Sequence, residues 1–114
     1  MKNIAVILAG CGTKDGSEIN ETVTLLLALD QHGLKYQCFA PDSNQYHVVN
    51  HVTGEVANEE RNMMVEAARI VRGNILPMSE FNADNFDGLA IPGGVGVANN
   101  IFTYFIDGMQ MTVL

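Results

Sequence analysis

The feature that most constrains the fold of this chain is a continuously apolar segment, residues 4–9, followed by the glycine-rich turn 10–16. A strand that is apolar at every position is buried on both faces, which is typical of a central strand in a parallel sheet covered by helices. We therefore expect this strand to lie in the middle of a sheet, with the turn at its carboxyl end.

A helix is predicted directly after this turn. Ser17 is a favoured N-cap residue, and Gly33 stands where a left-handed C-terminal cap belongs. Apolar residues recur between them with helical spacing, at Ile19, Val23, Leu26 and Leu27. We expect this apolar stripe to pack on the sheet.

The rest of the chain continues to alternate between strand and helix patterns. Strands are predicted at 35–39, 75–76 and 89–91, a small hairpin at 46–56 and a second helix starting at Asn58 and carrying Met63, Met64, Ala67, Ile70 and Val71 on one side. This order predicts an α/β fold with a doubly wound, mostly parallel sheet and a small inserted hairpin. The end of the chain, by contrast, is expected to lack a final helix over the second face of the sheet.

Composition narrows the functional classes. The 114 residues, 47% of them hydrophobic, suit a single domain, residues 1–114. Thirteen acidic against six basic residues set a net charge of −7, which disfavours nucleic acid and anionic membranes as partners. The apolar runs are too short for a membrane span, and two cysteines outside any CxxC motif indicate free thiols. A cytoplasmic location is the resulting expectation.

Neither a cofactor nor a metal is predicted. Glycines 10, 12 and 16 follow the spacing GxGxxxG rather than a dinucleotide fingerprint, and Glu18 stands where a P-loop would have its lysine. His47 and His51 have no third metal ligand at a recognisable spacing, so they are interpreted as surface residues of the hairpin.

Two strand ends carry the candidate site residues. Glu18 and Glu21 begin the first helix, either as a general acid/base or as solvent-facing acids. Pro92-Gly93-Gly94 follows a strand and is either a backbone oxyanion hole or a plain tight turn. Cys11 is interpreted as a packed thiol rather than a nucleophile.

Several strings of this sequence resemble one known family. They are Gly10-Cys11-Gly12, Asp15-Gly16-Ser17-Glu18, Asn50-His51-Val52-Thr53-Gly54-Glu55, Arg61-Asn62, Glu66-Ala67-Ala68-Arg69-Ile70 and Ile91-Pro92-Gly93-Gly94. The chain is identified by them as similar to the ElbB-type branch of the ThiJ/PfpI (class I glutamine amidotransferase-like) superfamily, also described as isoprenoid biosynthesis proteins with an amidotransferase-like domain.

The resemblance implies a flavodoxin-like fold, a homodimer and a cofactor-free, lyase-type glyoxalase that converts small 2-oxoaldehydes into 2-hydroxy acids. Glu21 matches the acid of the superfamily, and Gly93 and Gly94 match its backbone donors, with Gly94 the best oxyanion donor. Glu18, in the branch-specific Asp-Gly-Ser-Glu string, is the second candidate for the acid.

The same resemblance implies a difference from the family. Its cysteine on a nucleophile elbow belongs to a C-terminal half that this sequence is expected to lack. We therefore expect this chain to be inactive by itself. The alternative is a non-catalytic binding or regulatory half-domain that self-associates or pairs with another chain, and a third, weaker hypothesis makes Cys11 a substitute nucleophile.

Overall fold

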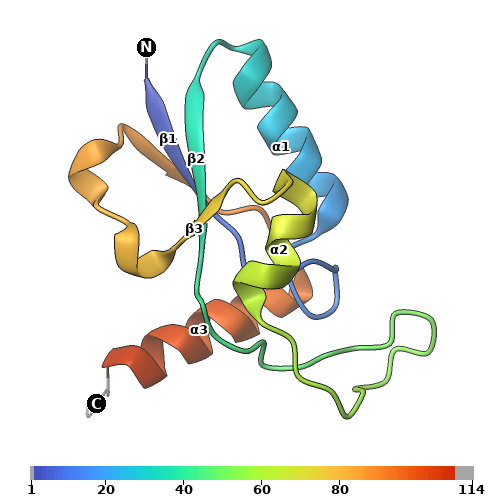
Figure 1. The fold of residues 1–114 in the computed structure, drawn as a ribbon. Coiled ribbons are helices and arrows are strands. Elements are labelled where there is room, and N and C mark those ends of the chain that lie inside the picture. The colour runs from blue at the N-terminus through green and yellow to red at the C-terminus, as the bar shows by residue number, and fades with distance from the viewer. Residues whose placement is uncertain (1, 110–114) are drawn as a thin grey trace.

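The computed structural model describes residues 2–109 as one parallel sheet with helices on both sides (Figure 1). Its strands are β1 (Asn3–Ile7), β2 (Lys35–Ala40), β3 (Ile75–Pro77) and β4 (Gly88–Ala90), in the order β3-β2-β1-β4 and all parallel. The helices are α1 (Ile19–Gln31), α2 (Met63–Val71) and α3 (Val95–Met109), and two 3-10 turns, η1 (Met78–Glu80) and η2 (Ala83–Asn85), lie between β3 and β4. The predicted α/β class and the central position of the first strand are confirmed.

Side chains of β1 alternate between two apolar layers. Val6 and Leu8 pack with Leu26 of α1 and Ala67 of α2 on one face of the sheet. On the opposite face, a second cluster is built by Ala5, Ile7, Phe39, Met78, Phe81, Phe86 and Ile101. Both faces of the central strand are therefore buried, which explains why every residue from 4 to 9 is apolar.

The N-terminus of α1 differs from the prediction. The cap is Glu18, whose carboxylate accepts hydrogen bonds from the backbone amides of Asn20 and Glu21, at 2.8 and 3.2 Å. Ser17 is fully buried instead, and its hydroxyl accepts a hydrogen bond from the Ala9 amide at 2.9 Å. The Ala9 amide lies beyond the end of β1 and needs an acceptor. If Ser17 capped the helix, its hydroxyl would not be available to this amide.

The predicted apolar stripe of α1 is also largely wrong. Leu26 packs on the sheet as expected, but Ile19, Val23 and Leu27 are 44–54% exposed. The buried side of the helix is instead formed with Thr22, whose hydroxyl donates to the Glu18 carbonyl oxygen at 2.7 Å. Because this bond satisfies the hydroxyl, a polar residue can lie where the hydrophobic pattern alone would not place one.

The second helix starts later than predicted. Asn62, not Asn58, is its N-cap, and the side-chain oxygen of Asn62 accepts a hydrogen bond from the Val65 amide at 2.9 Å. The residues before it are irregular, with a bend at Asn58, and the Gln45 amide donates to the Arg61 carbonyl oxygen at 2.8 Å. The predicted burial of Met63 and Ala67 is confirmed.

The inserted hairpin is present but shorter than predicted. It has one antiparallel bridge, Val49 with Val56, and Gly54 takes a positive φ of 80° at its turn. The last predicted strand is confirmed one residue earlier, as β4.

A helix that was not predicted, α3, follows β4, whereas the expected lack of a final helix concerned the chain end, where residues 110–114 lie outside the described residues. In Figure 1, α3 crosses below the carboxyl ends of the strands, and Ile101 packs into the second apolar layer. This helix was missed because its sequence offers no typical cap and no basic residue in its last turn. In the part of the chain that the structure describes, no helix has both the length and the apolar character needed to cross a membrane.

Candidate functional site

The two strand ends singled out in the sequence meet in the structure. β1 and β4 are parallel neighbours, so the glycine-rich loop after β1 and the Pro92–Gly94 turn after β4 leave the same edge of the sheet. The Glu18 amide donates to the Gly93 carbonyl oxygen and the Val95 amide to the Thr13 carbonyl oxygen, both at 2.7 Å. The glycine-rich loop, the start of α1 and the turn therefore form one hydrogen-bonded unit.

Gly94 allows this close contact. Its φ is 141°, a backbone conformation that side chains with a Cβ rarely adopt, and a Cβ at this position would overlap the Gly16 carbonyl oxygen. Glycine is therefore required here by the approach of two backbones.

Glu21 points at the turn. Its Oε1 atom accepts a hydrogen bond from the Gly93 amide at 3.1 Å, and a Cβ on Gly93 would lie only 2.7 Å from the same oxygen. Glu21 also lines an open hollow of about 430 Å³ along the first turns of α1, together with Glu18, Asn20, Thr24 and Leu25. The carboxylate is thus oriented by the turn and accessible to solvent.

The structure separates the two candidate acids by what they bind. Glu18 has both carboxylate oxygens engaged by amides of its own helix, whereas Glu21 reaches across to the turn.

The two backbone donors of the turn also differ. The Gly93 amide is bound to Glu21, while within residues 2–109 no protein group accepts a hydrogen bond from the Gly94 amide. Which of these groups acts on a substrate stays a prediction.

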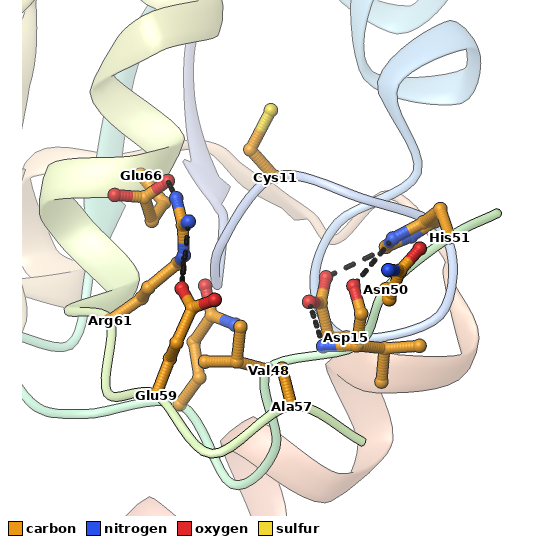
Figure 2. A pocket seen from close by; sticks show the side chains of 11 residues that line it. Cys11, Asp15, Val48, Asn50, His51, Ala57, Glu59, Arg61 and Glu66 are labelled. Carbon is orange, nitrogen blue, oxygen red and sulfur yellow. Dashed lines mark hydrogen bonds and ion pairs between the residues drawn. The ribbon is translucent and has the colours of Figure 1, made fainter. Parts of the chain in front are cut away.

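A second hollow of about 290 Å³ lies between the glycine-rich loop, the hairpin and α2 (Figure 2). It is lined by Cys11, Asp15, Gln45, Val48, Val49, Asn50, His51, Ala57, Glu59, Arg61 and Glu66. Arg61 lies on one side and bonds Glu59 and Glu66, at 2.9 and 3.3 Å. The hairpin that the sequence predicted therefore forms one wall of a polar cleft.

His51 and Asp15 join this hairpin to the glycine-rich loop. The Lys14 amide donates to His51 Nε2 at 3.1 Å, and Nδ1 lies 3.0 Å from the Val49 carbonyl oxygen. Nε2 also lies 3.9 Å from Asp15 Oδ1, so the ring lies between the glycine-rich loop and the hairpin backbone. Asp15 is buried and accepts a hydrogen bond from the Val49 amide at 2.8 Å.

Cys11 does not have the surroundings of an activated thiol. Burial raises its pKa above the ordinary value, and the negative charge of Glu66 acts in the same direction, against a smaller opposing effect of Arg69. Its thiol is therefore protonated near neutral pH, which works against a nucleophilic role. Among residues 2–109, no group of three or more histidine, cysteine or acidic residues is placed to hold a metal ion.

Asp15 was not among the predicted site residues, although it belongs to the Asp15-Gly16-Ser17-Glu18 string that carries the family resemblance. The sequence signal for Asp15 is an aspartate within a glycine-rich loop. A short carboxylate side chain in such a loop can accept a hydrogen bond from a nearby backbone amide.

Comparison with known proteins identifies relatives of the whole described domain. Over 111 residues the chain is 41% identical to the ES1 protein homolog, mitochondrial, of Rattus norvegicus and to the glutamine amidotransferase-like class 1 domain-containing protein 3, mitochondrial, of Homo sapiens. These matches cover 96% of this chain but 42% and 41% of the relatives. The ES1 protein, mitochondrial, of Danio rerio is 37% identical over 93% of the chain and 41% of its own length. No family model matches the chain.

A solved structure agrees with these relatives. The isoprenoid biosynthesis protein with amidotransferase-like domain from Ehrlichia chaffeensis superposes with a TM-score of 0.87 and 50% sequence identity. The match covers 94% of this chain and 50% of that protein. The chain therefore spans about half of this structure and about two fifths of the length of the curated relatives.

One prediction is overturned by these relatives. The sequence was expected to be cytoplasmic, but the proteins from rat, human and zebrafish are mitochondrial. The expectation rested on composition and on short apolar runs. Neither property determines the compartment to which a protein is targeted, because targeting depends on recognition of a signal by import machinery.

Proposed function

The homologues of this chain are glutamine amidotransferase-like class 1 domain proteins, and from that premise we propose that Glu21 and the Pro92–Gly94 turn form the acid/base part of a cofactor-free glyoxalase-type site. The substrate class is a small 2-oxoaldehyde, and the product is a 2-hydroxy acid. The observation that carries the proposal is the hydrogen bond from the Gly93 amide to Glu21 Oε1.

This hydrogen bond supports a role for Glu21 in proton transfer. Because one oxygen is held by the turn, the carboxylate has a defined direction, and within the described residues its other oxygen accepts no hydrogen bond. A general acid or base must stand within hydrogen-bonding reach of the atom it serves, and an oriented carboxylate meets that condition more often than a freely rotating one. The Gly94 amide, without a protein acceptor in residues 2–109, is the matching candidate for stabilising an oxyanion.

The chemistry balances without a cofactor. A thiolate adds to the aldehyde carbon and gives a hemithioacetal, from which a carboxylate removes the proton on that carbon. The proton is returned to the neighbouring carbon, giving a 2-hydroxy thioester, and water then hydrolyses the thioester to the acid and frees the thiol. In this sequence of steps Glu21 carries the proton and the Gly94 amide binds the developing oxyanion.

The thiol in this proposal is the nucleophile-elbow cysteine that the family resemblance implies. Cys11 suits the role poorly because its pKa is raised by burial and by Glu66. If Cys11→Ser removed glyoxal conversion while the fold was kept, Cys11 would have to be reinstated as the nucleophile.

The proposal is tested by following glyoxal conversion to glycolate by proton NMR without added thiols. The assay is run on this chain and on one of its longer relatives. We expect this chain to be inactive by itself, and we expect the glutamine variant at the relative's equivalent of Glu21 to lower the relative's kcat at least about 100-fold and to change its KM little. The control is the same change at the relative's equivalent of Glu60, an exposed glutamate outside the site, and it should keep the relative's full activity.

Three results would contradict parts of this proposal. Full activity of Glu21→Gln with activity lost in Glu18→Gln would move the role to Glu18. Full activity in both variants would remove the carboxylates from the mechanism. No conversion of glyoxal or methylglyoxal by either wild-type protein would overturn the glyoxalase function itself.

A second candidate function is a non-catalytic domain that associates with a second copy. Among the described strands β4 pairs with β1 alone, so its other edge is open. Leu89 and Ile91 are 58% and 49% exposed beside this edge. An open strand edge flanked by apolar side chains favours pairing with another chain.

A further inference from the structure

We infer that Asn100 is a positioning residue, which holds the glycine-rich loop against α3 and thereby maintains the contact between Glu21 and Gly93. The effect of Asn100 on catalysis rests on the proposed function, whereas its effect on the contact between Glu21 and Gly93 does not.

Asn100 is 1% exposed, and its side chain binds three separate segments. The amide nitrogen donates to the carbonyl oxygens of Ala9 and Asp15, at 3.0 and 2.9 Å. The amide oxygen accepts a hydrogen bond from the backbone amide of Tyr46 at 2.8 Å. One side chain therefore connects α3 to the end of β1, to the glycine-rich loop and to the segment that leads into the hairpin.

Only an amide side chain can make this set of bonds at this length. The two carbonyl oxygens need a donor with two hydrogens, and the Tyr46 amide needs an acceptor. An aspartate would supply the acceptor alone and bring a charge into a buried position, and an alanine would leave all three backbone groups without their partner.

The start of α3 lies directly against the same loop. The Val95 amide donates to the Thr13 carbonyl oxygen at 2.7 Å. A Cβ on Gly96 would overlap the backbone of Asp15, so the helix and the loop touch backbone to backbone at that point. Asn100, about one turn further along, binds the loop again at Asp15. The helix is thus joined to the loop at three successive places.

These bonds lead to the Glu21–Gly93 pair from both sides. The loop continues through Ser17 into the first turn of α1, which carries Glu21, and α3 is preceded by the turn that carries Gly93. The Glu18 amide then joins α1 to the turn by donating to the Gly93 carbonyl oxygen. If α3 shifted against the loop, Gly93 would shift against Glu21, and a hydrogen bond of 3.1 Å weakens quickly with such a displacement.

The test follows the Gly93 amide in the ¹⁵N-labelled chain during a pH titration. In the wild type its proton shift is expected to move as the Glu21 carboxyl titrates, because that amide donates to it, and Glu21→Gln should abolish the movement. In Asn100→Ala we expect the movement to fall to less than about half of the wild-type value. The control is Asn99→Ala, since Asn99 is an exposed asparagine in the same helix and should leave the movement unchanged.

A merely structural role for Asn100 would lower the melting temperature without altering this titration in the folded protein. The inference is therefore overturned if folded Asn100→Ala retains the full wild-type movement of the Gly93 signal. If that variant does not fold, Asn100→Thr replaces it, because the threonine hydroxyl can still donate to one of the two carbonyl oxygens.

The assay of glyoxal conversion separates this inference from the proposed function. If the Gly93 signal loses its response in Asn100→Ala while no wild-type protein converts glyoxal, the positioning role holds and the glyoxalase function fails. If the longer relative is active, its equivalent of Asn100→Ala keeps full kcat and folded Asn100→Ala of this chain keeps its Gly93 response, the function holds and the positioning role fails.

Discussion

At the scale of single residues, the candidate site depends on two adjacent glycines that serve different purposes. Gly93 donates its amide to Glu21, and a Cβ there would meet only the end of that flexible side chain. Gly94 has a positive φ, and a Cβ there would meet backbone. Gly94 was expected to be the better oxyanion donor of the two, and within residues 2–109 its amide has no protein acceptor.

We predict that Gly94→Ala lowers the free energy of unfolding by at least about 2 kcal/mol, because the strained backbone and the overlap with Gly16 cannot both be relieved. Gly93→Ala should lower the free energy of unfolding clearly less, because the Glu21 side chain can rotate away from the added methyl group. Urea unfolding followed by circular dichroism measures both. Equal losses in the two variants would show that the close approach at Gly94 does not hold the turn in place.

At the scale of elements, polar side chains decide where the helices begin. The sequence offers Ser17 and Asn58 as caps, whereas the structure uses Glu18 and Asn62. Ser17 was unavailable because it binds the Ala9 amide, and Asn58 lies at a bend four residues before the cap of α2. For Ser17, a locally favoured cap was overridden by a contact with the end of the preceding strand segment.

Removal of the true cap of α2 tests this assignment. Asn62→Ala should lower the free energy of unfolding by about 1 kcal/mol, since the Val65 amide loses its acceptor. Asn62 also donates to Asp42 Oδ1 at 2.8 Å, a bond between exposed groups that adds little. Asn58→Ala is the matched control, and a loss as large as that of Asn62→Ala would contradict the assigned start of the helix.

At the scale of the whole molecule, the open edge of β4 determines which of the two candidate functions is favoured. Self-association through this edge should appear in sedimentation velocity as a weight-average mass that rises with concentration. We expect Leu89→Lys to suppress the rise, since a charged residue beside an open strand edge opposes pairing. Val52→Lys, at a 94% exposed valine in the hairpin, should leave it unchanged. A constant monomer mass in the wild type would contradict the second candidate function.

The sequence by itself determined the class of the fold and the meeting of two strand ends. A strand apolar at every position has to be covered on both faces, and parallel strands that share a sheet bring their carboxyl ends to one edge. For that reason the central strand was predictable, and the small hairpin followed from its own alternating pattern and turn. The pairing of the first helix with the Pro92–Gly94 turn was implied by the family resemblance alone. The helix after β4 was not predictable, because nothing in its sequence marks either end.

Only the tertiary structure decided which polar groups bind one another. Glu18 and Glu21 are separated by three positions of one helix, and their difference arises from Gly93, more than seventy residues further along the chain. Asn100 and Asn99 are neighbours of the same type, yet one is buried with three partners and the other is exposed. The local sequence pattern predicts which faces of an element are apolar. A buried hydrogen bond cannot be predicted in this way, because it depends on where both partners lie in space.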